Sequence, residues 1–303
     1  RSARLASAYS SAGLGPDSKI GLFMYNCNEY QEAQYGAFKM RGVPININYR
    51  YVDEELHYLL DNSDAEAIVF HSSLGDRVGR VAGRLPRLKL LIEVTDGSTV
   101  TVENAVAYDD VIADHQPAPR LARYEDDIYM LYTGGTTGLS KGAMLSHRNM
   151  VFNVLQARTW QGPAFDDVDT IVAITALPLY HIFSLQSNCL TIMSLGGENV
   201  LITNPRDLPA FVKTMSGHKF VYFSGVNTLF AALLNTPGFG WWHGSTGGRG
   251  TRMAGRYRQL HFAGLRSDRN LAGRYCKPSD IIDGFQRLRR PANALNRSSY
   301  LRR

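Results

Sequence analysis

The sequence predicts an α/β fold with mostly parallel sheets. Short apolar runs alternate with helical segments over the first 240 residues, and strands separated by helices imply parallel pairing with right-handed crossovers. The composition is that of a globular protein, with 44% apolar and 20% charged residues among 303. No apolar run approaches the roughly 20 residues of a membrane-spanning helix, and the N-terminal stretch lacks the apolar middle of a secretory signal. We expect a cytoplasmic protein.

The first of two αβα-type lobes is expected over residues 1–120. Its apolar runs, each a candidate strand, are 19–25, 43–48, 65–70 and 88–94. Between them we predict a helix with Asn28 as its N-cap and Gly42 as its stop, a second helix from Asp53 and a third from Leu74. The polar stretch 96–127, which contains two prolines, is the expected boundary.

The second lobe is expected over residues 121–240. Its candidate strands are the apolar runs 127–133, 142–145, 170–176, 198–202 and 219–225. Helices are predicted to begin near Ser146, His181, Asp207 and Val226. The same alternation therefore continues past the polar boundary.

The composition changes near residue 240. Residues 1–240 hold 19 Lys and Arg against 24 Asp and Glu, whereas residues 241–303 hold 14 against 3. This last segment contains no Val and no Glu, which natural strands and helices use. We expect an irregular Arg-rich tail over 241–303. One hypothesis is out-of-frame translation of a GC-rich gene, and the other is an arm that binds nucleic acid or an anionic surface through phosphate contacts.

A glycine-rich segment at 132–142, YTGGTTGLSKG, carries the clearest chemical signal. Its glycines leave backbone N–H groups free to approach an anion, its threonines offer hydroxyl donors, and Lys141 adds a positive charge. Together these features predict a phosphate-binding loop. It is not a Walker A loop, because Lys141 is followed by Gly142 and an apolar strand instead of opening a helix. We expect the loop to join two antiparallel strands; the alternative is a hairpin that serves only as a turn.

This loop resembles the signature of the adenylate-forming superfamily, and of fatty acyl-CoA synthetases in particular. That signature reads roughly Tyr/Phe-Thr-Ser-Gly-Thr-Thr-Gly-x-Pro-Lys-Gly, and this sequence departs from it at Gly134 and Ser140. The resemblance runs from about residue 20 to residue 239 and includes LPLYHIFSLQ and GVNTLFAALL. The part before Lys141 is similar to actinobacterial steroid- and fatty-acid-activating synthetases, and the part after it to proteobacterial long-chain enzymes. A chimera is therefore a further hypothesis.

The resemblance implies the partial large N-terminal domain of an acid–thiol ligase. Such an enzyme uses ATP and Mg2+ to activate a fatty carboxylate as acyl-AMP, which CoA then converts to acyl-CoA. The residues implied to bind phosphate are Thr133, Gly134, Gly135, Thr136, Thr137, Gly138 and Lys141, with Thr133 also as a magnesium ligand. His181 is the implied catalytic residue beside the carboxylate. The acyl channel would be lined by Gly225, Val226, Asn227 and Thr228.

Several of these residues have a structural alternative. A lone His after a strand is often a capping or core residue, although the Leu-Pro-Leu-Tyr context of His181 favours the site. Val226 and Thr228 could instead be a core residue and a helix cap. The tyrosines near the first strand and helix are interpreted as packing, and the acidic run 125–127 as a solvated loop.

The family's Tyr-Gly-x-Thr-Glu motif, its ribose-binding Asp and its small C-terminal domain with a catalytic lysine do not appear in the sequence. The resemblance therefore implies a fragment with weak or no turnover, because several transition-state contacts are missing at once. The alternative function is a non-catalytic nucleotide-binding remnant, or a binder that acts through the Arg-rich tail.

The expected partner is a fatty-acid substrate, with no specific nucleic acid. Peripheral contact with the inner membrane face is a further expectation. The cysteines, Cys27, Cys189 and Cys276, are odd in number and far apart, which favours reduced thiols over disulfides or a zinc site. Acyl chain length and oligomeric state stay open.

Overall fold

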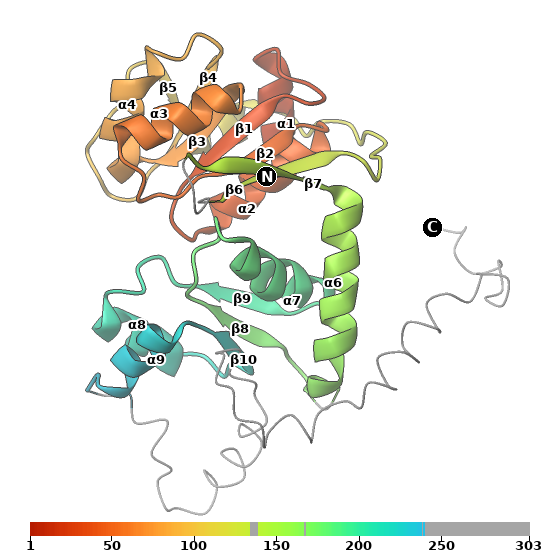
Figure 1. Ribbon diagram of the computed structural model, residues 1–303, viewed down its shortest axis with the longest axis vertical. Coiled ribbons are helices and arrows are strands. Elements are labelled where there is room, and N and C mark those ends of the chain that lie inside the picture. The colour runs from red at the N-terminus through yellow and green to blue at the C-terminus, as the bar shows by residue number, and fades with distance from the viewer. Residues whose placement is uncertain (134–138, 167, 238, 240–303) are drawn as a thin grey trace, which may run out of the picture. The chain divides into compact units, whose positions relative to one another are not determined.

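A computed structural model describes residues 1–133, 139–166, 168–237 and 239 (Figure 1). The α/β prediction is confirmed. The larger sheet contains β1 (Lys19–Phe23), β2 (Val43–Asn46), β3 (Ala65–His71), β4 (Leu90–Val94), β5 (Ala105–Ala107), β6 (Ile128–Thr133) and β7 (Lys141–Ser146). The strand order is β5-β4-β3-β1-β2-β6-β7. Every neighbouring pair is parallel except β6 and β7, which are antiparallel.

Helices cover both faces of this sheet, as its apolar pattern requires. They are α1 (Ser2–Ser11), α2 (Asn28–Lys39), α3 (Asp53–Asn62), α4 (Gly75–Ala82) and α5 (Tyr108–Asp114), with a 3-10 turn at Ser72–Leu74. Alternate residues of β3 point to opposite faces: Val69 packs with α1, α2 and α5, whereas Phe70 packs with α3 and α4. Figure 1 shows α3 and α4 together on one face.

The smaller sheet is fully parallel, with the order β10-β8-β9. Its strands are β8 (Val172–Thr175), β9 (Glu198–Leu201) and β10 (Tyr222–Ser224). Its helices are α6 (His147–Gln161), α7 (Thr191–Ser194), α8 (Leu208–Ser216) and α9 (Asn227–Leu234), with a 3-10 turn at Gly162–Ala164 and a π-helical segment at Ser184–Leu190. The predicted helix starts near Ser146 and Asp207 are confirmed, and each of these side chains accepts a hydrogen bond from a first-turn N–H.

The sheets divide the chain at a different place from the expected lobes 1–120 and 121–240. Strands β6 and β7 belong to the larger sheet, because β6 pairs in parallel with β2, with Ile45 opposite Met130. Tyr129 of β6 is fully buried in that sheet's core. The polar stretch 96–127 also contains β5 and α5, which the sequence reading missed.

Two details of the first predicted helix are wrong. Cys27, and not Asn28, is the N-cap of α2, and its side chain makes no capping bond. After α2 the left-handed backbone conformation falls on Arg41, with a φ of 62°, and not on Gly42. Gly42 has little room for a side chain, because a Cβ there would lie 2.5 Å from Met40 Cε and 3.1 Å from a backbone oxygen. The N-terminal helix α1 was not predicted.

The side chain of Asn26 joins the two sheets. It follows β1 and is 3% exposed. Its Nδ2 donates to the carbonyls of Thr175 and Leu177 at 3.2 and 2.9 Å, and its Oδ1 accepts from the N–H of Leu179 at 2.8 Å. The hydroxyl of Thr203 donates to the backbone carbonyl of Asn26 at 3.1 Å. The residue that follows β1 of the larger sheet therefore binds the end of β8 and the segments that follow β8 and β9 of the smaller sheet.

Asn46, at the end of β2, repeats this arrangement. It is 2% exposed, and its Nδ2 donates to the carbonyls of Leu179 and Tyr180 at 3.3 and 3.2 Å. Since a buried amide without partners costs about 1–3 kcal/mol, these two side chains strongly favour one placement of the segment 175–180.

His71, at the end of β3, is also buried at the edge where the strands end. It is 4% exposed. Its Nδ1 accepts the backbone N–H of Tyr25 at 3.0 Å, so this nitrogen carries no proton. Burial lowers the pKa of His71 below its ordinary value of 6.5.

We predict that Asn26→Ala lowers the free energy of unfolding by about 3 kcal/mol, because three buried backbone groups lose their partner. Urea titration followed by circular dichroism measures this. Asn153→Ala, at an exposed position of α6, is the control and should change the midpoint little. Equal midpoints for the two variants would show that Asn26 does not hold the sheets together.

We also predict that stability falls as the pH drops below 6.5. The unfolded chain then protonates His71 while the folded chain resists protonation, so unfolding gains up to about 1.4 kcal/mol per pH unit from this group. Urea midpoints between pH 5 and 8 test the slope. In His71→Asn, whose amide oxygen can accept the Tyr25 N–H, the slope should be smaller. An unchanged slope would assign the effect to other groups.

Candidate functional site

The candidate phosphate loop begins and ends at one antiparallel hairpin. Thr133, the last residue of β6, lies opposite Lys141, the first residue of β7. Both side chains are exposed. The expectation that the loop joins two antiparallel strands is confirmed. The predicted phosphate-binding residues Gly134, Gly135, Thr136, Thr137 and Gly138 lie outside the described residues.

Tyrosine side chains fix the base of this hairpin. Tyr58 donates its hydroxyl to the Ser140 carbonyl at 3.0 Å, and the Tyr51 hydroxyl lies 3.4 Å from Ser140 Oγ. The ring of Tyr132 lies over Gly142, where a Cβ would come within 3.0 Å of it. A glycine is therefore needed at 142 for close packing. These contacts hold the residue before Lys141 against the segment that follows β2.

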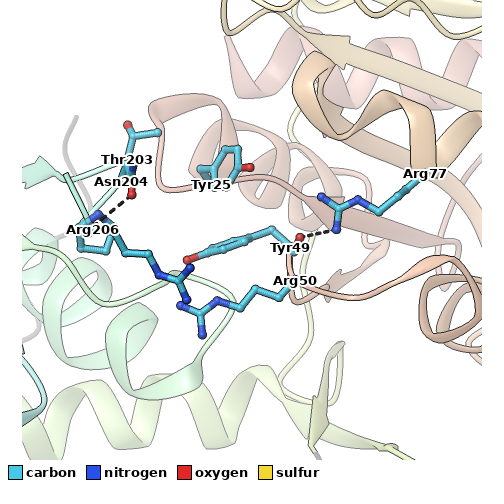
Figure 2. A pocket seen from close by; sticks show the side chains of 8 residues that line it. Tyr25, Tyr49, Arg50, Arg77, Thr203, Asn204 and Arg206 are labelled. Atoms are coloured by element: carbon cyan, nitrogen blue, oxygen red, sulfur yellow. Dashed lines mark hydrogen bonds between the residues drawn. The ribbon is translucent and has the colours of Figure 1, made fainter. Parts of the chain in front are cut away.

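A pocket of about 610 Å3 lies where strands of both sheets end (Figure 2). Its lining residues are Tyr25, Tyr49, Arg50, Arg77, Thr203, Asn204, Pro205 and Arg206. Tyr25 follows β1, Tyr49 and Arg50 follow β2, and residues 203–206 follow β9. In parallel α/β sheets, ligands bind beyond the carboxyl ends of the strands, which is where these residues lie.

Three arginines give this pocket a positive charge. Arg77 donates to the carbonyls of Tyr49 and Tyr51 at 2.8 and 2.7 Å, so it supports the segment after β2. Figure 2 shows Arg50 and Arg206 extending from opposite sides toward each other. Among the residues that the structure describes, neither makes a salt bridge within 4.0 Å. The pocket therefore suits an anion that can take hydrogen bonds from guanidinium groups.

His181 lies beside this pocket at the end of a row of aromatic rings. Its ring is 4.5 Å from that of Tyr180, which is 5.2 Å from Tyr49, which in turn is 4.8 Å from Tyr25. Burial, and then the charge of Arg50, lower the pKa of His181. A neutral imidazole near Arg50 can accept a proton or a hydrogen bond at neutral pH. The structure thus brings His181 near the segment after β2, in which Tyr51 contacts Ser140.

The residues predicted to line an acyl channel lie at the start of α9. Val226 is the N-cap of this helix, without a capping side-chain bond, and it is 53% exposed. Asn227 and Thr228 are exposed as well. A Cβ on Gly225 would lie 3.1 Å from the Phe230 ring, so the space next to this glycine contains that side chain. The channel role of these four residues stays a prediction.

No cluster of three or more His, Cys, Asp or Glu suited to a metal is found in the described part of the chain. Thr133 offers a single hydroxyl at the end of β6, so its role as a magnesium ligand stays a prediction. Cys27 and Cys189 are free thiols. No helix within the described ranges is long and apolar enough to cross a membrane.

The sequence reading missed the pocket itself. Tyr25 belongs to the tyrosines expected to pack near the first strand, and no sequence motif marks Tyr49, Arg50, Arg77 or Arg206. The signal was available, because polar and aromatic residues directly follow three predicted strands, and strand ends are where parallel sheets bind ligands. Asn26 gave no signal, since its partners are 149 to 177 residues away in the chain.

Curated proteins similar to this chain include CoA ligases. The chain is 36% identical over 263 residues to a long-chain-fatty-acid–CoA ligase of Escherichia coli O6:H1, which covers 78% of this chain and 46% of that protein. It is 39% identical over 153 residues to 3-oxocholest-4-en-26-oate–CoA ligase of Rhodococcus rhodochrous, covering 50% of this chain and 28% of that protein. The chain thus spans about half the length of the Escherichia coli ligase.

Solved structures agree on the fold. Anthranilate CoA ligase AuaEII superposes with a TM-score of 0.69 at 22% identity, over 78% of this chain and 45% of that one. The match to the AMP-binding enzyme family covers residues 1–276, so it runs past residue 239, where we expected the resemblance to end. Since this match covers most of the sequence, the chain belongs to the AMP-binding enzyme family.

Proposed function

We propose that this chain is the N-terminal part of a fatty-acid–CoA ligase. The observation that carries the proposal is the hairpin register, which sets Thr133 and Lys141 opposite each other at the two ends of the glycine-rich loop. The 36% identity to the Escherichia coli long-chain ligase supports the fatty-acid substrate class. The identity to the Rhodococcus ligase keeps a steroid carboxylate as a second candidate substrate.

The proposed reaction has two steps. An oxygen of the fatty carboxylate attacks the α-phosphorus of ATP, and the bond to pyrophosphate breaks. The sulfur of the CoA thiolate then attacks the acyl carbon of acyl-AMP, and AMP leaves. In the first step the protein mainly positions reactants and stabilises charge on phosphate oxygens.

Lys141 and the loop 133–138 would bind the β- and γ-phosphates of ATP. The hairpin presents the ammonium of Lys141 and the hydroxyl of Thr133 from directly opposed strand positions, so one polyanion could contact both. The Thr133 hydroxyl is the kind of hard oxygen ligand that Mg2+ prefers. When bound, the ion would neutralise phosphate charge.

His181 would lie beside the reacting carboxylate. Its lowered pKa keeps the ring neutral, so it can orient a carboxylate-bearing substrate by hydrogen bonding without forming a fixed ion pair. Gly225, Val226, Asn227 and Thr228 would line the path of the acyl chain at the start of α9. The exposure of Val226, Asn227 and Thr228 leaves these three residues accessible to a ligand.

The arginine pocket would bind the phosphates of CoA. Its volume of about 610 Å3 lies in the range of ordinary ligand pockets. The guanidinium groups of Arg50 and Arg206 have no carboxylate partner among the described residues, and tyrosine rings beside them suit a nucleotide. This assignment separates the two nucleotides: ATP at the hairpin loop and CoA between the strand ends.

Two alternatives to the ligase make different predictions. A non-catalytic nucleotide-binding remnant predicts ATP binding without pyrophosphate release. A binder acting through residues 241–303 predicts salt-sensitive binding of single-stranded oligonucleotides that disappears on deletion of that segment.

We place the protein in the cytoplasm, with peripheral contact to the inner membrane face where fatty acids partition.

The ATP assignment predicts that Lys141→Ala weakens MgATP binding to the full chain at least tenfold, or about 1.4 kcal/mol, because one charge–phosphate contact is lost. Isothermal titration measures it. Lys213→Ala, which removes an exposed lysine in the last turn of α8, is the control and should bind like the unmodified chain. Equal affinities of both variants would contradict the proposal.

The CoA assignment predicts that Arg50→Gln and Arg206→Gln each weaken CoA binding about tenfold and leave MgATP binding unchanged. Titration of both ligands against both variants separates the two sites. Arg158→Gln, in the last turn of α6, removes one positive charge elsewhere and serves as the control. A parallel loss of ATP and CoA affinity would show that the pocket and the loop form one nucleotide site.

A further inference from the structure

A second pocket, of about 350 Å3, is formed by the start of α1, the end of α2 and the segment that precedes β6. It shares no described lining residue with the pocket at the strand ends. Its volume is at the lower end of the range of ligand pockets, so it suits a small ligand or one chemical group of a larger one. We call it the basic pocket, because three of its described lining residues are cationic: Ala3, Lys39, Ala118, Pro119, Arg120 and Arg123.

The cations of the basic pocket have no carboxylate partners. Within the described ranges, Lys39, Arg120 and Arg123 make no salt bridge shorter than 4.0 Å. No Asp or Glu is among the described residues that line the pocket. Like charges around one small pocket repel each other, and an anion bound between them removes that repulsion. The charge pattern therefore favours an anionic ligand.

The segment 115–124, which forms one wall of the basic pocket, is attached to α1. It contains neither helix nor strand, but the N–H of Ala118 donates to the carbonyl of Ala3 at 2.8 Å. Prolines at 117 and 119 restrict the backbone on both sides of this bond. The wall therefore loses little conformational freedom when a ligand binds, which favours affinity.

A buried ion pair fixes the end of this wall against the end of α2. Asp127 is 7% exposed, and its carboxylate accepts the N–H of Tyr124 at 3.0 Å and Nη2 of Arg41 at 2.7 Å. The Arg41 guanidinium also lies 4.4 Å from the centre of the Tyr124 ring. Arg41 lies two residues after Lys39, and Tyr124 directly follows Arg123. The ion pair therefore sets the backbone positions of two of the pocket's cations relative to each other.

We propose that the basic pocket binds a phosphate group through Lys39, Arg120 and Arg123. Guanidinium groups donate paired hydrogen bonds to phosphate oxygens, and an ammonium group adds a point charge. Both arginines are exposed, so a ligand reaches them from solvent. The inference rests on the geometry of this pocket and not on the proposed reaction.

Two sources supply such a phosphate group, a soluble phosphate monoester and the headgroup of an anionic lipid. Leu121, between the two arginines in the sequence, is 41% exposed. With a lipid headgroup in the pocket, this side chain would contact the acyl-chain region of the bilayer. The two sources therefore differ in what lies next to the bound phosphate, and separate probes distinguish them.

The test for both sources is hydrogen–deuterium exchange of the full chain, read at the amides of residues 115–124. This readout is local, so binding at the glycine-rich loop, at the strand-end pocket or by residues 241–303 does not enter it. One probe is glycerol 3-phosphate. The other is a phosphatidylcholine vesicle with phosphatidylglycerol, compared with a vesicle of phosphatidylcholine alone. We expect protection by at least one of the two phosphate probes, and the probe that protects identifies the source.

The double variant Arg120→Gln with Arg123→Gln should raise the probe concentration that gives half-maximal protection about tenfold or more, because two charge-assisted contacts are lost. Lys39→Gln, on α2, should raise it as well, so the result does not depend on changes in the segment 115–124 alone. Arg158→Gln with Lys213→Gln removes the same charge at exposed positions of α6 and α8 and is the matched control. Thermal melting should be the same for all these variants, since none of the changed side chains has a carboxylate partner among the described residues.

Three results would overturn the proposal. One is the absence of protection at residues 115–124 with both millimolar glycerol 3-phosphate and the anionic vesicles. Another is protection that the arginine double variant leaves unchanged. The third is an equal loss in the double variant and the charge-matched control, since this would assign the effect to the net charge of the chain. A failure here leaves the ATP and CoA sites to their own titrations.

Discussion

The arrangement of the candidate site depends on the amide side chain of Asn26. It is buried just after β1, where it binds backbone groups of the segment 175–179, while the backbone carbonyl of Asn26 accepts the hydroxyl of Thr203 from the segment after β9. Apolar contacts between the sheets would allow sliding, because they have no preferred direction. Hydrogen bonds to backbone groups fix a register, and a buried amide that lost them would be left unsatisfied.

Asn26 and Asn46 anchor the two walls of the pocket at the strand ends. Residues 203–206, which form one wall, are anchored at Thr203, and the opposite wall follows β2, whose last residue Asn46 binds the segment that contains Tyr180. Tyr49 then contacts Tyr180, and Tyr51 contacts Ser140. One short stretch after β2 therefore adjoins the pocket, the His181 segment and the base of the glycine-rich loop. Ligands at these places would be near one another without any single cavity enclosing them.

The sequence predicted strands better than it predicted their assembly. Apolar runs identify β1, β3 and β8 because buried parallel strands are apolar on both faces. The same property does not indicate which sheet a strand joins. The prediction therefore puts β6 and β7 in the second lobe, whereas they belong to the larger sheet. Helix α1 was missed because its small residues gave a weak periodic pattern. Asn26 was missed because its partners are distant in the chain, and residues 134–138, the centre of the predicted site, lie outside the described structure.

The pairing of the charged side chains bears on where the protein can bind an anion. Residues 1–240 carry more acidic than basic side chains, yet many of the arginines away from the strand ends have carboxylate partners, such as Arg80 with Asp53 and Arg84 with Glu54. Arg50 and Arg206 have none among the described residues, and they face each other across the pocket. Exposed ion pairs contribute little to stability, so pairing at the surface mainly cancels charge. These two guanidinium groups set positive charge at the strand ends, within residues 1–240 whose net charge is negative, and this charge favours an anion there.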